Sequence, residues 1–382
     1  MDILLDYATL RVIWWGLLGV LLIGFAVTDG YDLGTAMLLP VVARSDVERR
    51  VTLNCIGPVW EGNQVWLILG AGAIFAAFPA IYAVAFSGFY IAMLLVLATL
   101  ILRPVGFDFR NKLENPVWRR TWDWALFAGG FVPAVVFGVA FGNLLQGVPF
   151  SFDEDLRVSY QGGFFDLLNP FALVSGVLSA SMLAMHGAAW LSLKTEGVIR
   201  DRARLALTIA AGLAALLFAI AGVWVWSALD GYAFVSSPVP GGPSNPLLKD
   251  VQRVAGGWVA NYGRHPWMII APVVGFVGMA LAVLLNVARR ELTALLSSGL
   301  AVAGVIATAG VSMFPFLMPS SLDPHASLTV WDATSSRTTL LLMLFAGVIF
   351  LPIILAYTGF VLRVLRGKVT AEYVENNSHS LY

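Results

Sequence analysis

The sequence has few charged residues for its length. Of its 382 residues only 12% are Asp, Glu, Lys or Arg, against roughly 25% in an average soluble domain. The 23 basic and 23 acidic residues cancel, so there is no basic excess with which to bind the phosphates of a nucleic acid. Cys55 is the single cysteine, which excludes a disulfide scaffold. The sequence also lacks zinc-ligand spacings, a glycine-rich phosphate loop and a nucleophile elbow.

Hydrophobic residues make up 59% of the chain and occur in long runs, such as the uncharged stretch from Ile81 to Leu102. Such runs are typical of membrane helices, because a helix needs about 20 apolar residues to cross the hydrocarbon core. The runs are continuously apolar, whereas the strands of a membrane barrel alternate. The first run begins at Val12 and lacks a small-residue cleavage site at its end. We interpret it as a retained first helix rather than a cleaved signal.

We therefore predict an all-α, polytopic integral membrane protein with about nine transmembrane helices. Residues 1–382 form a single membrane domain in this interpretation. The predicted helices lie near residues 10–40, 52–78, 80–103, 122–146, 167–193, 204–228, 267–288, 293–314 and 338–363.

Lys and Arg concentrate in alternate connections between these helices, namely those that follow the first, third, fifth, seventh and ninth. Short cytoplasmic loops carry the positive charge in membrane proteins, so this pattern places the N-terminus outside and the C-terminus in the cytoplasm. The connections on the other side include residues 148–166 and 229–266, which we expect to be solvated loops, the second of them periplasmic. Asp332 precedes the last predicted helix and is expected to cap it.

Ionisable residues inside the apolar segments are the candidates for function, because a charge in the bilayer costs several kcal/mol. Glu61 lies about nine residues into the predicted helix 52–78, which places it near the membrane midplane. Its neighbours Asn63 and Gln64 are polar, and Asn54 lies seven residues earlier on the same helix face. The pattern favours a proton relay or an ion site. A hydrogen-bonded contact between helices is the alternative.

Two aspartates in the first predicted helix share a face, because Asp29 and Asp32 are three residues apart. The nearby Gly30 and Gly34 permit either a close helix approach or a break in the helix. If the helix continues to residue 40, Asp29 lies inside the membrane. If it ends near residue 32, both aspartates are interfacial. The sequence leaves these alternatives open.

Ligands for a metal or a haem are scarce. His186 is the only one of the four histidines inside a predicted helix, and no second helical histidine pairs with it. We therefore expect no metal or cofactor-binding site in this chain, and axial haem ligation by His186 is the less favoured interpretation of that residue. Trp66 differs from the tryptophans predicted near the membrane surfaces, because it lies deep and beside the polar residues around Glu61.

Several stretches resemble subunit II of the cytochrome bd ubiquinol oxidases. They extend from the first predicted helix to the last residue of the chain. The matching stretches are residues 24–32 (GFAVTDGYD), 62–66 (GNQVW), 103–108 (RPVGFD), 141–149 (FGNLLQGVP), 313–316 (MFPF), 318–321 (MPSS), 327–329 (SLT), 331–336 (WDATSS) and 379–382 (HSLY).

The resemblance implies an oxidase subunit in the bacterial inner membrane. The family's enzyme oxidises a membrane quinol, ubiquinol or menaquinol, and reduces dioxygen to water with protons from the cytoplasm. Its two b-type haems and one haem d are expected in the partner, subunit I. The resemblance further suggests a structural quinone, small accessory membrane subunits and membrane lipid as partners.

Subunit II of this family is thought to offer proton or oxygen routes toward the haems, and no catalytic residue is expected in this chain. The residue before Gly-Asn-Gln is an aspartate in a well-known member of the family, so Glu61 keeps the carboxylate with a longer reach. Without the resemblance, the leading alternative is a secondary transporter that uses midplane carboxylates, although no inverted repeat is visible. A purely structural subunit is a third alternative. The proton-pathway candidates are Glu61, Asp29, Asp32, Asp108 and Tyr382, and Trp66 is a candidate for an oxygen route or for packing.

Overall fold

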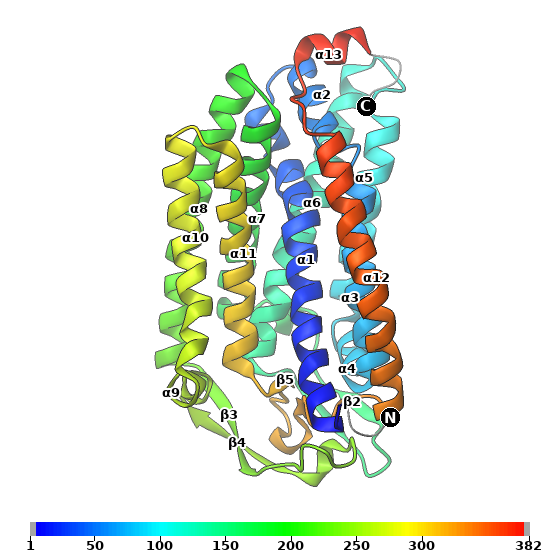
Figure 1. The fold of residues 1–382 in the computed structure, drawn as a ribbon, viewed down its shortest axis with the longest axis vertical. Coiled ribbons are helices and arrows are strands. Elements are labelled where there is room, and N and C mark those ends of the chain that lie inside the picture. The colour runs from blue at the N-terminus through cyan, green and yellow to red at the C-terminus, as the bar shows by residue number, and fades with distance from the viewer. Residues whose placement is uncertain (1–4, 378–382) are drawn as a thin grey trace.

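The structure, a computed structural model, describes residues 5–377 and forms a bundle of long helices (Figure 1). Within this described range eight helical segments are long and apolar enough to cross a membrane, and a bent pair of helices provides a ninth if it counts as one span. The prediction of an all-α membrane protein with about nine transmembrane helices is confirmed. The eight segments are α1 (Tyr7–Val42), α5 (Tyr90–Phe109), α6 (Pro116–Gln146), α7 (Pro170–Lys194), α8 (Gly197–Ser227), Pro266–Val287 with α10 (Ile270–Val287), α11 (Glu291–Met313) and α12 (Arg337–Val364).

The prediction of two continuous helices at 52–78 and 80–103 is wrong, because each of these segments is interrupted by a turn or a bend. α2 (Asp46–Asn54) ends before a turn that contains Pro58, and α3 (Trp60–Ala77) begins after it. α4 (Pro79–Gly88) is bent by 119° from α3. Proline at the first turn of a helix is tolerated, but it cannot continue the hydrogen bonding of a preceding helix. α5 then runs to Phe109, beyond the predicted end at residue 103.

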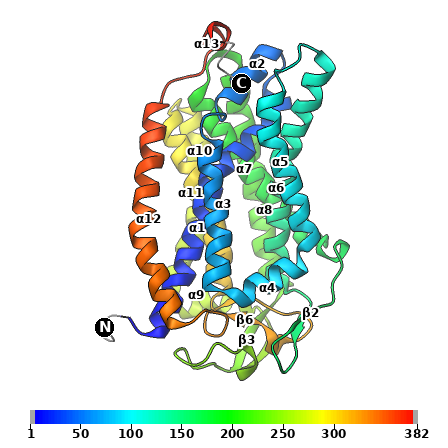
Figure 2. The same cartoon turned by 90° about the vertical axis from the view of Figure 1, so that its right-hand side faces the viewer.

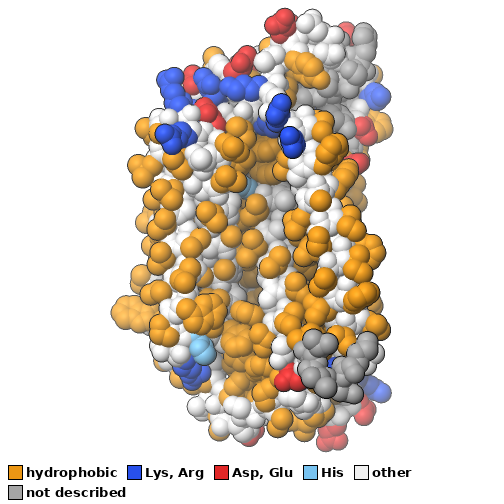
Figure 3. Space-filling model, viewed as in Figure 1, with side chains coloured by type: hydrophobic (Ala, Val, Ile, Leu, Met, Phe, Trp, Pro, Cys, Tyr) orange, Lys and Arg blue, Asp and Glu red, His pale blue; other side chains and the backbone are white. Residues whose placement is uncertain are grey.

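The two ends of the bundle differ in composition and structure. One end carries α2, α13 (Ala371–Asn376) and the connections rich in Lys and Arg, and we call it the basic end (Figures 1 and 3). The other end, the hairpin end, carries three antiparallel strand pairs, so the predicted loops 148–166 and 229–266 contain regular structure. The pairs are β1 (Phe150–Phe152) with β2 (Val158–Tyr160), β3 (Asp230–Ser236) with β4 (Asp250–Ala255), and β5 (Phe316–Met318) with β6 (Leu328–Thr329).

Short helices complete the hairpin end. They are η1 (Phe165–Leu167), η2 (Pro246–Leu248), η3 (Gly257–Val259), α9 (Ala260–Arg264), η4 (Pro266–Ile269) and η5 (Pro324–Ala326).

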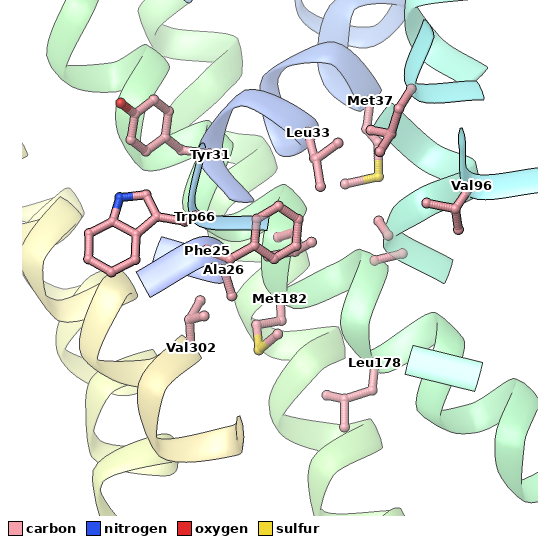
Figure 4. Packing of buried hydrophobic residues seen from close by; sticks show 14 of the residues in the cluster. Phe25, Ala26, Tyr31, Leu33, Met37, Trp66, Val96, Leu178, Met182 and Val302 are labelled. Carbon is pink, nitrogen blue, oxygen red and sulfur yellow. The ribbon is translucent and has the colours of Figure 1, made fainter. Parts of the chain in front are cut away.

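α1 is the central helix and packs against α3, α6, α7 and α11. It is unbroken through Gly30 and Gly34, which resolves the alternatives left open by the sequence. At Gly34 the backbone of α7 lies so close that a Cβ atom would overlap the carbonyl oxygen of Leu183, and Gly187 of α7 meets α1 in the same way. These glycines therefore permit a close crossing of two helices. Figure 4 shows apolar side chains that pack in this core, among them Phe25 of α1 and Met182 of α7.

Two buried basic side chains, Arg11 and Lys249, hold the loops of the hairpin end in place. The guanidinium of Arg11, which is fully buried, donates hydrogen bonds to the carbonyl oxygen of Gly242 (3.0 Å) and to the hydroxyl of Thr334 (2.8 Å). Lys249 Nζ lies 2.9 Å from Asp332 Oδ2, and the two side chains are 0% and 1% exposed. Burial lowers the pKa of Lys249, and the charge of Asp332 opposes this effect. The expectation that Asp332 caps the last helix is wrong, because Ser336 caps α12 and Asp332 is engaged by Lys249.

α12 is the most exposed of the long helices and stands at the edge of the bundle (Figure 2). Its ends are tied to the rest of the chain. At the hairpin end Trp14 Nε1 donates a hydrogen bond to the carbonyl oxygen of Leu340 (2.9 Å). At the basic end Lys194 Nζ donates to the carbonyl oxygens of Leu365 and Gly367. Between these ties α12 presents a wide apolar surface that only lipid or another protein can cover.

Candidate functional site

Asp29 of α1 forms a buried, two-pronged ion pair with Arg103 of α5. Arg103 Nη2 lies 2.5 Å from Asp29 Oδ1 and Nη1 lies 3.1 Å from Oδ2. The side chains are 1% and 0% exposed. Such a fork of two parallel hydrogen bonds is the strongest geometry available to a carboxylate and a guanidinium. Asp29 is therefore inside the bundle with its charge matched.

Asp32 lies about one helical turn farther along α1, and no basic side chain in the described part of the chain forms an ion pair with it. Its Oδ2 accepts a hydrogen bond from Asn63 Nδ2 of α3 (2.8 Å), and the same amide donates to the hydroxyl of Tyr31 (2.6 Å). Asp32 Oδ1 is buried and has no hydrogen-bond partner among residues 5–377. The ring of Tyr31 stacks on Trp190 of α7 with 4.2 Å between ring centroids. The cluster therefore joins α1, α3 and α7 and contains one carboxylate that is only partly satisfied.

Glu61 lies in the first turn of α3 and is exposed on the surface of the chain. The prediction that it lies about nine residues into a continuous helix is wrong, because α3 begins at Trp60. Asn54 therefore does not share a helix with it. A carboxylate is favourable at this position, since the amide groups at a helix N-terminus attract negative charge. Asn63 follows two residues later, about 200° around the helix, and points inward to Asp32 while Glu61 points outward.

His186 of α7 is buried, and both of its ring nitrogens have protein partners. Nε2 lies 2.9 Å from the carbonyl oxygen of Val27, and Nδ1 lies 2.8 Å from the hydroxyl of Ser298. A carbonyl oxygen can only accept, so Nε2 carries the proton and the lone pair of Nδ1 faces Ser298. The side chain ties α7 to α1 and α11. No nitrogen lone pair is directed at a position that a haem iron could take.

The remaining candidates from the sequence are Trp66, Asp108 and Tyr382. Trp66 is 3% exposed and packs over Gly24 of α1, where an added Cβ atom would lie 2.5 Å from its ring. Asp108 is exposed in the last turn of α5. Tyr382 lies outside the described residues.

The sequence did not predict the basic partners of the buried aspartates. The predicted helix 80–103 ends at Arg103, whereas α5 continues past this residue and directs its side chain at Asp29. A second missed cluster lies at the basic end, where the fully buried Arg110 contacts Asp123 (2.6 Å) and Asp46 (2.8 Å). One physical argument could have predicted these pairs. An aspartate inside a membrane helix needs a counter-charge, and a basic residue next to an apolar run can supply it.

The comparisons with known proteins agree with this architecture. The profile of the cytochrome bd terminal oxidase subunit II family matches residues 10–365. The chain belongs to this family. A probable cytochrome oxidase subunit 2 from Haemophilus influenzae is 53% identical, covering 99% of this chain and 100% of its own length. Subunit 2 of the cytochrome bd-I ubiquinol oxidase from Escherichia coli K12 is 51% identical over the same shares.

More distant relatives extend the comparison. Subunit 2 of the cytochrome bd ubiquinol oxidase from Bacillus subtilis is 32% identical, covering 95% of this chain and 98% of its own. The fold is shared with a chain of the bd oxidase structure from Geobacillus thermodenitrificans, with a TM-score of 0.70 and 18% identity over 93% of this chain and 98% of that one. The resemblance seen in the sequence is confirmed. The alternative of a secondary transporter finds no support in these matches.

Proposed function

We propose that this cytochrome bd subunit II supports the oxidation of ubiquinol or menaquinol coupled to the reduction of dioxygen to water, in the inner membrane of a bacterium. The observation that carries the proposal is the family match over residues 10–365, which includes all or nearly all of every candidate membrane span. Subunit I is the partner that this role requires, with small accessory subunits and lipid around the complex.

The haems belong to subunit I in this proposal. Haem iron takes axial ligands from residues such as His, Met or Cys that converge on one site. In the described part of the chain His186 is the one histidine inside a membrane span, and both of its nitrogens are already engaged. The proposal therefore assigns the two b-type haems and haem d to subunit I.

The role of this chain in proton uptake centres on Glu61 and Asp32. Glu61 is exposed beside apolar side chains of α3, such as Ile68, which is 69% exposed. A carboxylate on such a surface would be costly against lipid, so a partner protein is expected to cover it. Asn63 connects the same turn of α3 to Asp32 inside the bundle. Asp29 is the weaker candidate because Arg103 already matches its charge. Asp108 and Tyr382 remain candidates nearer the chain surface and the tail.

A structural quinone is proposed for an apolar cavity within the bundle. The cavity has a volume of about 720 Å³ and is lined mainly by residues of α1, α6, α7, α8, α10 and α11. Apolar walls of this size suit an isoprenoid chain. Tyr262 and Ser312, whose hydroxyl oxygens are 2.8 Å apart, offer polar groups at the hairpin end. Ala309→Trp, which would narrow the cavity, should reduce the quinone extracted from the purified complex, whereas Ala288→Trp outside the cavity should not.

The orientation is proposed from charge, with the basic end in the cytoplasm and the hairpin end outside. A reporter that is active only outside should work when fused after Gly241 and should be inactive after Arg200. Activity at Arg200 would contradict the charge argument.

The relay hypothesis is tested by Glu61→Gln in the assembled oxidase. This variant keeps the shape and hydrogen-bonding capacity of the side chain but cannot carry a proton. Quinol oxidase turnover should fall by roughly 100-fold, the low end of what proton-transfer groups contribute, while haem content per complex stays normal. Glu61→Asp should be much milder, and Glu154→Gln in an exposed loop serves as the control. Normal turnover in Glu61→Gln would refute the relay, and lost haem content would favour a structural role.

A further inference from the structure

Thr35 of α1 does not use its hydroxyl as other threonines in these helices do. Thr28, Thr52 and Thr99 each donate to the carbonyl oxygen four residues earlier, at distances of 2.7, 2.9 and 2.8 Å. Thr35 is fully buried, and its Oγ1 has no hydrogen-bond partner within residues 5–377. A buried hydroxyl without a partner costs on the order of 1–3 kcal/mol, so such groups in folded proteins are almost always satisfied by something.

The second unsatisfied atom lies on the same helix face. Asp32 precedes Thr35 by three residues, and its Oδ1 is buried without a partner in the described chain. Side chains three residues apart on a helix have Cβ atoms about 5–6 Å apart. Asp32 and Thr35 are therefore neighbours on one helix face, close enough for one water molecule to contact both side chains.

We propose that one buried water molecule bridges Asp32 Oδ1 and Thr35 Oγ1. The water donates one hydrogen bond to the carboxylate and accepts one from the threonine hydroxyl. Water at buried polar sites usually has two to four such partners, and this pair supplies the minimum. The site is distinct from the Asp29–Arg103 pair, whose oxygens and nitrogens are already matched.

The position of this water gives it a role in proton uptake, an inference that rests on the proposed function of Asp32. Thr35 lies one helical turn from Asp32 toward Val42, where α1 ends at the basic end. The water therefore sits on the side of Asp32 that faces the proposed cytoplasmic surface. With Asn63 on Oδ2 and water on Oδ1, both oxygens of the carboxyl group are hydrogen-bonded.

The test compares Thr35→Val with Thr35→Ser in the complete oxidase. Valine has the shape of threonine without the hydroxyl, and serine keeps the hydroxyl. Thr28→Val is the matched control, because it removes a hydroxyl that is already bonded to Gly24. The first measurement is a cryo-electron microscopy map of the complex that resolves ordered water. The second is the infrared carboxyl stretching band that is lost in Asp32→Asn.

We expect water density between residues 32 and 35 in the wild type and in Thr35→Ser, and none in Thr35→Val. The infrared band assigned to Asp32 should shift in Thr35→Val and stay in place in Thr28→Val, with turnover several-fold lower in the former only. Absent density in the wild type, or density that persists in Thr35→Val, would overturn the proposal. The water density and the infrared band do not depend on Glu61, so the bridging water can be refuted while the Glu61 relay is supported. Normal turnover in Glu61→Gln would refute the relay, and the water density would still decide whether the bridging water exists.

Discussion

Arg103 matches the charge of Asp29 inside the bundle and leaves Asp32, one turn away, without a cation in direct contact. The two contacts of the Asp29–Arg103 pair measure 2.5 and 3.1 Å and join α1 to α5. Two aspartates that look equivalent in the sequence thus have different environments. Asp29 is fixed by a guanidinium, whereas Asp32 is held by an amide and has one oxygen without a protein partner among residues 5–377.

Removing one member of this pair should destabilise the chain strongly. Asp29→Asn or Arg103→Met should each lower the free energy of unfolding by about 3–5 kcal/mol, because the remaining charge is buried without a partner. The double variant should lose less than the sum of the two. Asp155→Asn in the exposed pair with Arg157, 3.8 Å long, should change stability by about 0–1 kcal/mol.

Thermal unfolding of the purified complex measures these differences, and turnover per assembled complex separates two roles for Asp29. Full turnover in Asp29→Asn complexes that do assemble would assign Asp29 to structure. A loss of turnover in Asp29→Asn at normal haem content would instead support a role for Asp29 in the proton pathway.

The close crossing of α1 and α7 should not tolerate a side chain at Gly34. Gly34→Ala would force its Cβ atom into the backbone at Leu183, which cannot move like a flexible side chain. Overpacking of this kind costs about 1–3 kcal/mol or more, so assembled complex and unfolding temperature should both fall. Gly16→Ala is the control in the same helix, since nothing lies within 4 Å of its added Cβ. Equal behaviour of the two variants would contradict the role assigned to the crossing.

The helices were predictable to the extent that each contains a long apolar run. α7 and α11 lie within three residues of their predicted starts and ends, whereas α6 and α8 begin six and seven residues earlier than predicted. The break before α3 was harder to predict, because apolar residues continue across it. Gly57 and Pro58 mark that turn in the sequence, and they should have limited the predicted helix 52–78.

The polar cluster was predictable only in part. The need for a partner near Asp29 follows from the cost of a buried charge, but its identity does not. Arg103 is separated from Asp29 by 74 residues, and their contact depends on how α5 packs beside α1. The inward turn of Asn63 likewise depends on where α3 begins, which the sequence placed too early.

The ion pair at the hairpin end gives a third stability prediction. Lys249→Met should leave Asp332 buried and unpaired, with a loss of about 3–5 kcal/mol. Lys249→Met combined with Asp332→Leu removes both charges and should recover part of that loss. Thermal unfolding of the complex measures both. A double variant that is less stable than Lys249→Met would show that Asp332 matters mainly through its hydrogen bonds with Thr329.

His186 should be a structural residue of this chain and not a haem ligand. His186→Ala removes contacts with Ser298 of α11 and Val27 of α1 and leaves a small cavity among three helices. We expect a loss of about 1–3 kcal/mol in the unfolding free energy of the complex. Ser298→Ala removes one of the two contacts and should cost less. The haem content per complex and the visible spectrum should be unchanged in both variants, since Nδ1 faces a hydroxyl and Nε2 faces a carbonyl. A haem band lost in His186→Ala but kept in Ser298→Ala would show that the imidazole binds iron in the assembled oxidase.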